Sequence, residues 1–435
     1  MSRTLSAGSM TLERGGPTDP AHDERLRRGI IETQVTRPVA WLLTLLFLAA
    51  IYGVPLSQAY LEKREGEDSS LAELFKRLPT GDNLHQVEKS IEDASYAKAW
   101  VQPRAQLWLT DFGREGNKLA VVGHAGWLYF TPGVLHVGGP GFLDRVTQRS
   151  REREALDSGQ EPLHADPLPA ITTFQRSLAQ RGARLVVFPM PDKASLEPGP
   201  LHGRSRGPIM PAQNIDYDRF LRTLREAGIA VFDARDSAPR RHEHPLYLAQ
   251  DTHFTPEFME LIARDLANTV RTLGVLPPLA DAPRLHAIEQ PASRVGDLVD
   301  MLKLPDDQRL FQAQSVLVHQ VQDESNVAWE PDPAADVLLL GDSFTNIFSL
   351  EGMGWGSDSG LAPHLALSLH RPIDVIAQND SGAFATRRAL SRELQAGQDR
   401  LAGKRVVIWE FAARELSVGD WKPLEFPTPP ATEAN

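Results

Sequence analysis

The sequence contains no cysteine at all. This absence excludes a thiolate nucleophile, a disulfide framework and a zinc site built on thiolates, because each of them needs cysteine sulfur. The composition suits an oxidising compartment. A chain of 435 residues can bury a large core and needs no such cross-link to fold.

Basic residues are also fewer than acidic residues. Lysine and arginine number 46 against 57 aspartate and glutamate residues, which leaves a net charge of −11. Proteins that bind nucleic acid present a basic surface, so we expect no nucleic-acid partner. The hydrophobic share of 41% and the charged share of 24% are typical of a globular protein. The length predicts two or three domains, at about 150 residues each.

Long apolar runs are absent except for one. No charged residue occurs from Pro38 to Leu56, and about 17 to 25 apolar residues are enough to cross a bilayer. A buried globular helix and a cleaved signal peptide are the alternatives. A long polar segment precedes the run and no clear A-x-A cleavage site directly follows it, which disfavours a signal peptide. We therefore predict one uncleaved transmembrane helix over residues 38–56.

Basic residues orient this predicted helix. Arginines 25, 27, 28 and 37 precede it, and the positive-inside rule keeps that side in the cytoplasm, although Lys63 and Arg64 weaken the bias. In a bacterium, the rest of the chain would then face the periplasm from the inner membrane. The predicted division is a disordered cytoplasmic tail at 1–37, a membrane anchor at 38–56, a helical stalk at 57–114, an α/β domain at 115–416 and a proline-rich tail at 417–435.

The central part of the sequence predicts an α/β fold with a doubly wound parallel sheet. Short apolar runs rich in β-branched residues alternate with amphipathic segments, which is the pattern of such a sheet. The predicted strands are 185–188, 229–232, 337–340, 373–376 and 406–409, and the predicted helices include 171–180, 217–226 and 256–273.

Other segments are less regular. A glycine turn predicts a small strand pair over 120–130, residues 143–166 read as a charged surface insertion, and residues 277–331 show only weak patterning. Ligands bind beyond the carboxyl ends of parallel strands. We therefore expect Ser343, Lys193 and Asn379 to gather at that edge of the sheet.

The apolar run 337–340 ends abruptly in Gly341-Asp342-Ser343. A buried strand that ends this way brings a serine hydroxyl to the edge of the sheet. Serine is a weak nucleophile and needs a neighbouring base. Asp251 and His253, two residues apart before a predicted helix, offer an imidazole and a carboxylate that can orient it. Together these residues indicate a serine acyl-transfer enzyme, in which Asp342 shapes the turn.

Each motif has an ordinary structural alternative. Gly-Asp-Ser can be a helix-capping turn, and Asp-x-His can also precede a helix as a cap. Thr345 stands where a G-x-S-x-G elbow needs its second glycine, which disfavours the α/β-hydrolase class. A zinc site is a further alternative, although two of its histidines lie in a polar turn beside arginines, and we predict no metal. Its candidate ligands are His242, His244, Asp251 and His253.

Five motifs follow one another in an order that makes the chain similar to the alginate O-acetyltransferase AlgJ/AlgX family, whose domain is SGNH-hydrolase-like. They are Gly-Trp-Leu-Tyr at 126–129, Pro-x-Lys-Ala-Ser at 191–195, Asp-Thr-His at 251–253, Gly-Asp-Ser-Phe at 341–344 and the segment 407–416. Ordinary SGNH hydrolases have the serine motif first, whereas the Asp-x-His motif comes first here, which is the permuted order of this family. Phe254 stands where the family usually has tryptophan. Because the sequence ends soon after Leu416, we expect no carbohydrate-binding module of the AlgX kind, which makes the chain more similar to AlgJ.

The resemblance implies that Ser343, His253 and Asp251 form a catalytic triad. It implies acetylation of hydroxyl groups on an exopolysaccharide in the periplasm, without a cofactor. It also implies a partner, a membrane-bound O-acyltransferase that supplies acetyl groups across the inner membrane.

Further residues are candidates for contacts to the substrate or to an oxyanion. The N–H of Ser343 is a natural first oxyanion donor, and Asn379 can supply an amide, as asparagine does in SGNH enzymes, or can be a turn residue. Lys193 is a candidate contact to the substrate or the acetyl donor. A basic strip for a polyanion, or alternatively a solvated helix face, is formed by Arg387, Arg388, Arg392 and Arg414.

Three functions are compatible with these residues. The first is an O-acetyltransferase with an acetyl-serine intermediate, and this is the function we predict. The second is an esterase that uses the same triad to remove acetyl groups from carbohydrate. The third is a non-catalytic, membrane-anchored subunit of a polysaccharide-modification complex, which the intact Ser343, His253 and Asp251 disfavour.

Overall fold

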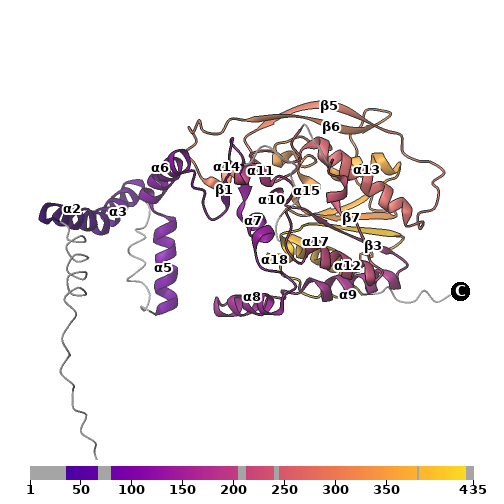
Figure 1. Ribbon diagram of the computed structural model, residues 1–435, viewed down its shortest axis with the longest axis horizontal. Coiled ribbons are helices and arrows are strands. Elements are labelled where there is room, and N and C mark those ends of the chain that lie inside the picture. The colour runs from indigo at the N-terminus through magenta and orange to yellow at the C-terminus, as the bar shows by residue number, and fades with distance from the viewer. Residues whose placement is uncertain (1–35, 67–79, 204–211, 240–243, 380–381, 428–435) are drawn as a thin grey trace, which may run out of the picture. The chain divides into compact units, whose positions relative to one another are not determined.

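A computed structural model describes residues 36–66, 80–203, 212–239, 244–379 and 382–427 of the chain. The chain divides into two compact units, residues 1–102 and 103–435 (Figure 1). The predicted cytoplasmic tail lies outside the described residues except for positions 36 and 37.

The first unit contains the long apolar helix. It runs as α2 (Arg37–Leu48), a π-helical turn (Ala49–Gly53) and α3 (Val54–Glu65). The π-helical turn lies directly before Pro55, which lacks the N–H that a regular helix would use. The segment Arg37–Glu65 is long and apolar enough to span a membrane, and its most apolar window is entirely unburied. It is compatible with the predicted single-pass anchor. The helix α5 (Gly81–Asp93) follows, and α6 (Tyr96–Gly113) runs across the boundary of the two units.

The second unit is built on a five-stranded sheet of order β4-β3-β9-β7-β8, in which all four strand pairs are parallel. All five strands predicted from apolar runs are present. Their bounds are β3 (Arg184–Met190), β4 (Ala230–Val231), β7 (Val337–Gly341), β8 (Asp374–Ala377) and β9 (Val406–Ala412). The fold is therefore the predicted doubly wound α/β sheet.

Helices cover both faces of this sheet, because successive side chains of a strand point to opposite faces. Leu339 of β7 belongs to the apolar cluster that includes α13 and α16, whereas Leu338 and Leu340 belong to the cluster that includes α9, α12 and α17. Figure 1 shows α13 on one side of the strands and α9 and α12 on the other. Their bounds are α9 (Pro167–Gln180), α12 (Tyr217–Glu226), α13 (Pro256–Thr272), α16 (Leu361–Leu369) and α17 (Gly382–Gln395).

Two antiparallel strand pairs flank the main sheet. The predicted pair at 120–130 is present as β1 (Ala120–Val122) and β2 (Leu128–Phe130). The second pair, β5 (Leu285–Arg294) and β6 (Gln314–Asp323), was not predicted, although ten residues of each strand face one another. Most of β5 is exposed on both faces and it contains Pro291, so neither alternation nor composition reveals the strand. Between them lies α14 (Asp297–Leu302).

Short helices complete the second unit. They are α7 (Thr131–Gly138), α8 (Arg145–Asp157), α10 (Lys193–Leu196), α11 (Pro198–His202), α15 (Ser343–Asn346) and α18 (Glu415–Val418). The predicted charged insertion contains α8. The segment predicted as a proline-rich tail differs from the expectation, because Trp421 and Phe426 within it are buried against the apolar cluster around α9. Its last residues, 428–435, lie outside the described part of the chain.

Candidate active site

The turn after β7 presents Ser343 at the carboxyl end of the sheet. All five residues of β7 are buried, and Ser343 begins α15 directly after Asp342. Gly341 is required here, since a Cβ at this position would lie 2.1 Å from Thr345 Oγ1. The abrupt change from strand to turn that the sequence predicted is therefore enforced by a close approach of Thr345 to the backbone.

His253 lies between Ser343 and Asp251. Its Nε2 is 2.8 Å from Ser343 Oγ, and its Nδ1 is 2.7 Å from Asp251 Oδ1. The structure therefore brings together the three residues that the sequence predicted as a triad. The side chains of His253 and Asp251 are 3% and 2% exposed, so the imidazole is shielded from water except toward the serine.

The second oxygen of Asp251 is also satisfied. Oδ2 accepts hydrogen bonds from the indole N–H of Trp355 at 2.9 Å and from the backbone N–H of Asp297 at 3.1 Å. Burial alone would raise the pKa of Asp251, but the hydrogen bond and charge of His253, together with these two donors, hold it well below its ordinary value. Asp251 is therefore an anion placed to orient the imidazole and to stabilise its protonated form.

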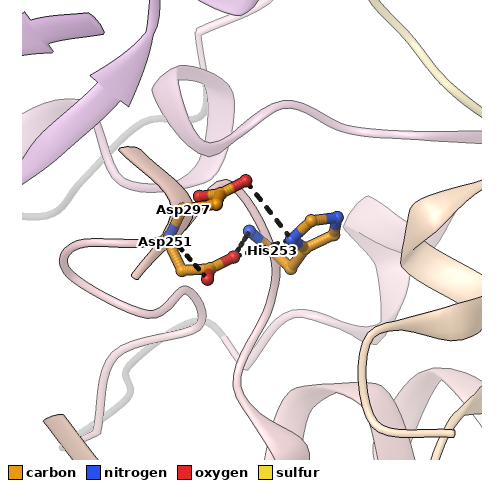
Figure 2. A group of neighbouring side chains, drawn as sticks. All are labelled: Asp251, His253 and Asp297. Carbon is orange, nitrogen blue, oxygen red and sulfur yellow. Dashed lines mark hydrogen bonds and ion pairs between the residues drawn. The ribbon is translucent and has the colours of Figure 1, made fainter. Parts of the chain in front are cut away.

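Asp297 is a second carboxylate beside the imidazole, and the sequence analysis missed it. Its Oδ1 accepts the backbone N–H of Thr252 at 2.7 Å, and its Oδ2 lies 4.0 Å from His253 Nδ1. Figure 2 shows that Asp251 and Asp297 approach the imidazole from the same end. Burial and the charge of Asp251 raise the pKa of Asp297. It lies in the weakly patterned stretch, far along the chain from Asp251, so no spacing signal pointed to it.

Asp251, His253 and Asp297 are also close enough together to be considered as metal ligands. In the structure His253 Nδ1 and Asp251 Oδ1 are hydrogen-bonded to each other at 2.7 Å. Among the four ligands of the alternative zinc site, His242 lies outside the described residues. The described geometry is that of a hydrogen-bonded triad.

Beneath the serine lies a buried pair of carboxyl groups, Asp342 and Glu410. Asp342 accepts the backbone N–H of Phe344 and that of Ala412 on β9, both at 2.8 Å. Glu410 Oε2 accepts the backbone N–H of Asp342 at 2.9 Å and the hydroxyl of Thr345 at 3.0 Å. Asp342 shapes the turn, as expected, and Glu410 supports it from the neighbouring strand.

Glu410 differs from an ordinary surface glutamate in its protonation. It is 1% exposed, and burial followed by the nearby charge of Asp342 raises its pKa well above its ordinary value of 4.5. The direction is the one expected for two neighbouring buried carboxyl groups, because both cannot be ionised at low cost.

Lys193 lies inside the protein and has no exposed face for a substrate. Its Nζ donates to the backbone oxygens of Leu128 at 2.7 Å and Ala249 at 3.2 Å, and it lies 5.6 Å and 5.4 Å from the ring centres of Trp127 and Tyr129. Burial lowers its pKa to about 7. These contacts link β2 to the loop that carries Asp251, so its described neighbours indicate a structural function.

Arg414 lies against the serine turn. Its guanidinium is 5.9 Å from the ring centre of Phe344 and 5.0 Å from that of Phe130, and it contacts Asp192 at 3.1 Å. Asn379 is exposed at the end of β8, where its side-chain oxygen accepts a hydrogen bond from Asn346 of α15. Both candidates are therefore joined to residues beside the nucleophile, and their contacts to a ligand stay predictions.

The four arginines of the predicted basic strip differ in exposure, and only Arg392 is exposed rather than buried or half-buried. Arg387 is fully buried, and its guanidinium lies 4.8 Å from the ring centre of Trp409 on β9. Arg388 is only partly exposed and lies over Phe384. One face of α17 packs on the sheet and the opposite face is turned to solvent. Arginines next to each other in sequence therefore point in different directions.

We expect Trp355→Phe to weaken the support of Asp251, because it removes the indole N–H and keeps an aromatic ring. The unfolding free energy of the full chain in detergent should fall by about 1.5 to 3 kcal/mol, the range for a hydrogen bond to a charged group. Labelling of Ser343 by a sulfonyl fluoride should also slow. Chemical denaturation followed by circular dichroism and mass spectrometry measure the two effects.

Trp421→Phe is the matched control, since Trp421 donates its indole N–H to the uncharged backbone carbonyl oxygen of Glu415 at 3.1 Å. It should cost only about 0.5 to 1.5 kcal/mol and leave the labelling rate unchanged. Equal labelling rates in the two variants would contradict a function of Trp355 in orienting the triad.

We expect Glu410→Gln to preserve the serine turn and Glu410→Ala to disrupt it. A glutamine oxygen can accept the same two hydrogen bonds, whereas alanine leaves the N–H of Asp342 and the hydroxyl of Thr345 unpaired, at a cost of about 1 to 3 kcal/mol each. The comparison is made by chemical denaturation at several pH values.

The sign of the pH effect follows from the raised pKa of Glu410. The stability that its protonated form contributes is complete below the unfolded-state pKa, ordinarily 4.5, and is lost as the pH rises toward the folded-state pKa. Glu410→Gln has no such group, so its unfolding free energy should fall less than that of the wild type as the pH rises above the unfolded-state pKa. Parallel pH profiles would show that Glu410 is ionised in the folded protein.

Comparison with known proteins identifies a family and similar sequences. Residues 120–413 match the family described as "SGNH hydrolase-like domain, acetyltransferase AlgX". A protein of Azotobacter vinelandii named "Probable alginate O-acetylase AlgJ" is 25% identical over 323 residues, which are 72% of this chain and 73% of the relative. The protein of the same name from Pseudomonas aeruginosa is 26% identical over 316 residues, which are 69% of this chain and 71% of the relative.

Two solved structures are also similar. The O-acetyltransferase domain of Pseudomonas putida AlgJ has a TM-score of 0.49 and 21% identity, and the match covers 69% of this chain and 93% of that chain. Pseudomonas aeruginosa AlgX has a TM-score of 0.45 and 17% identity, with 68% and 65% covered. The family match spans about two thirds of the sequence, from β1 to the residue after β9. This chain therefore belongs to the AlgX family of SGNH hydrolase-like acetyltransferase domains.

Proposed function

We propose that this protein is a membrane-anchored O-acetyltransferase that acetylates hydroxyl groups of an exopolysaccharide through an acetyl-serine on Ser343. The observation that carries the proposal is the hydrogen-bonded series from Ser343 Oγ through His253 to Asp251. Membership of an acetyltransferase family supports the choice of acyl group.

In the first half of the proposed reaction, Ser343 Oγ attacks the carbonyl carbon of an acetyl donor. Its proton passes to His253 Nε2, 2.8 Å away. Asp251 stabilises the imidazolium that forms. The tetrahedral intermediate then collapses, His253 returns the proton to the leaving group, and acetyl-serine remains.

In the second half, a sugar hydroxyl takes the place of the leaving group. His253 removes its proton while the hydroxyl oxygen attacks acetyl-serine, and the proton returns to Ser343 Oγ when the C–O bond to the serine breaks. Transfer must compete with hydrolysis. The burial of His253 and Asp251 supports transfer, since water reaches the imidazole only past the serine.

The proposed oxyanion donors are the backbone N–H of Ser343 and the side chain of Asn379. The N–H of Ser343 is the first of α15 and donates no hydrogen bond within the described residues. Asn379 is held by Asn346 on the last turn of the same helix. Arg414, packed on Phe344, is the proposed contact to the substrate.

The names of two relatives, alginate O-acetylases, favour a polymer of uronic acids as the acceptor. The apolar helix at Arg37–Glu65 and the arginines before it favour an inner-membrane anchor with the catalytic unit in the periplasm. Acetyl groups would then have to arrive from the cytoplasmic side. We therefore propose a membrane-bound O-acyltransferase as the partner that supplies them.

The test uses the full chain in detergent with a chromogenic acetyl ester and mass spectrometry. Wild-type protein should gain one acetyl group on Ser343 and pass it to an added oligosaccharide, whereas Ser343→Ala should form no adduct. Ser325→Ala, in an exposed turn, is the control and should behave as the wild type.

Two results would overturn the proposal. Release of acetate at a rate that no oligosaccharide changes, with no acetylated sugar, would identify an esterase. An adduct that persists in Ser343→Ala, or its absence from both proteins, would remove Ser343 from the reaction.

A further inference from the structure

The helix α8 is attached to the second unit by few contacts. Ala155 is its only buried residue. Arg151 donates to the backbone oxygen of Gly419 at 2.9 Å, and Gln148 donates to that of Phe142 at 3.0 Å. Figure 1 shows α8 at the margin of this unit. Most of its surface is therefore open to solvent.

The outward face of α8 carries a row of arginines. Arg145, Arg149 and Arg153 are spaced four residues apart and all three are exposed. In a helix this spacing puts them on one face, about 6 Å apart along the axis. No carboxylate of the described residues lies within ion-pair distance of any of them. We call these three residues the α8 arginine row.

The stability of the helix does not explain this row. Like charges four residues apart repel and destabilise a helix, and α8 has little packing to offset that cost. Two acidic residues of the same segment have other contacts: Asp144 caps the helix through the N–H of Thr147, and Glu152 approaches the N–H of Ala165. Glu154 is exposed next to Arg153. Asp157 follows only at the C-terminal end of the row.

Contacts made by Arg151 connect α8 to the segment that follows Arg414. Gly419, which Arg151 contacts, is five residues after Arg414, and α18 lies between them. Ser417 of α18 contacts His136 of α7 at 2.6 Å. Figure 1 shows α7, α18 and α8 following one another in the same region. The helix α8 is therefore joined, through the residues after α18, to the segment that carries Arg414.

We propose that the α8 arginine row binds carboxylates of a polyanionic polysaccharide acceptor. This inference rests on the proposed function, since it takes a polymer of uronic acids as the acceptor. Such a polymer carries one carboxylate on each sugar, which suits a row of guanidinium groups. The chain has a net charge of −11 and would repel a polyanion elsewhere, so a local positive row decides where the polymer binds.

The test measures binding rather than turnover. The full chain in neutral detergent is titrated into a fluorescently labelled oligouronate of eight sugars, and fluorescence anisotropy gives Kd. The triple variant Arg145→Gln/Arg149→Gln/Arg153→Gln should raise Kd about eightfold, since each exposed ion pair contributes roughly a factor of two. The effect should shrink as salt is raised. The carboxyl-reduced oligosaccharide should bind the wild type and the variant equally.

Two further variants serve as controls. Arg176→Gln/Arg222→Gln/Arg225→Gln changes the net charge by the same amount at exposed positions of α9 and α12 and should leave Kd within twofold of the wild type. Replacing the α8 arginine row by lysines keeps the charge and should raise Kd less than the glutamine variant does, since lysine keeps the ionic attraction but not the paired hydrogen bonds of a guanidinium group.

The proposal is overturned if the α8 glutamine variant binds the oligouronate as tightly as the wild type. It is equally overturned if the α9/α12 control weakens binding as much, because the effect is then one of net charge alone. Acetylation of Ser343 by the chromogenic ester is measured on each variant and should not change. Loss of that adduct in the wild type would contradict the proposed function, while the binding result would still decide the function of α8.

Discussion

The described site depends on the pair of buried carboxyl groups at the ends of β7 and β9. Asp342 accepts a backbone N–H from β9, and Glu410 of β9 accepts the backbone N–H of Asp342, so the turn that carries Ser343 is tied to the neighbouring strand in both directions. Backbone groups lose their partners where a strand ends, and buried ones must find others. Two neighbouring buried carboxyl groups cannot both be ionised at low cost. Burial and the charge of Asp342 raise the pKa of Glu410.

The histidine half of the site is held by segments that are distant in sequence. Trp355 and the backbone of Asp297 bind Asp251, and Lys193 holds the oxygen of Ala249 just before it. These contacts are buried or partly buried, and away from water hydrogen bonds are stronger and unpaired groups cost more. The imidazole is therefore fixed between a carboxylate and the serine. In the proposed reaction this leaves one route for the proton, toward Ser343 or the hydroxyl that replaces the donor.

Charge is distributed unevenly over the second unit. Arginines of this unit have opposite surroundings: Arg387 is buried against Trp409, while the α8 arginine row faces solvent. Arg414 is partly exposed. It pairs with Asp192 and packs on Phe344, the residue next to the nucleophile. A negatively charged protein that acts on a polyanion needs local positive surfaces, and the proposed acceptor site supplies one outside the catalytic turn.

The sequence by itself determined the α/β fold, the five strands of the sheet, the single apolar helix and the three residues that meet in the triad. These features rest on local patterns, which are apolar runs, glycine at a tight turn, and a spacing of two between Asp251 and His253. Only the tertiary structure decided that Asp297, Trp355 and Glu410 support the triad, that β5 and β6 pair, and that Lys193 and Arg387 are buried. Each of those outcomes depends on partners brought together from distant parts of the chain, and the free energy of burial and hydrogen bonding there is set by the packed environment rather than by neighbours in sequence.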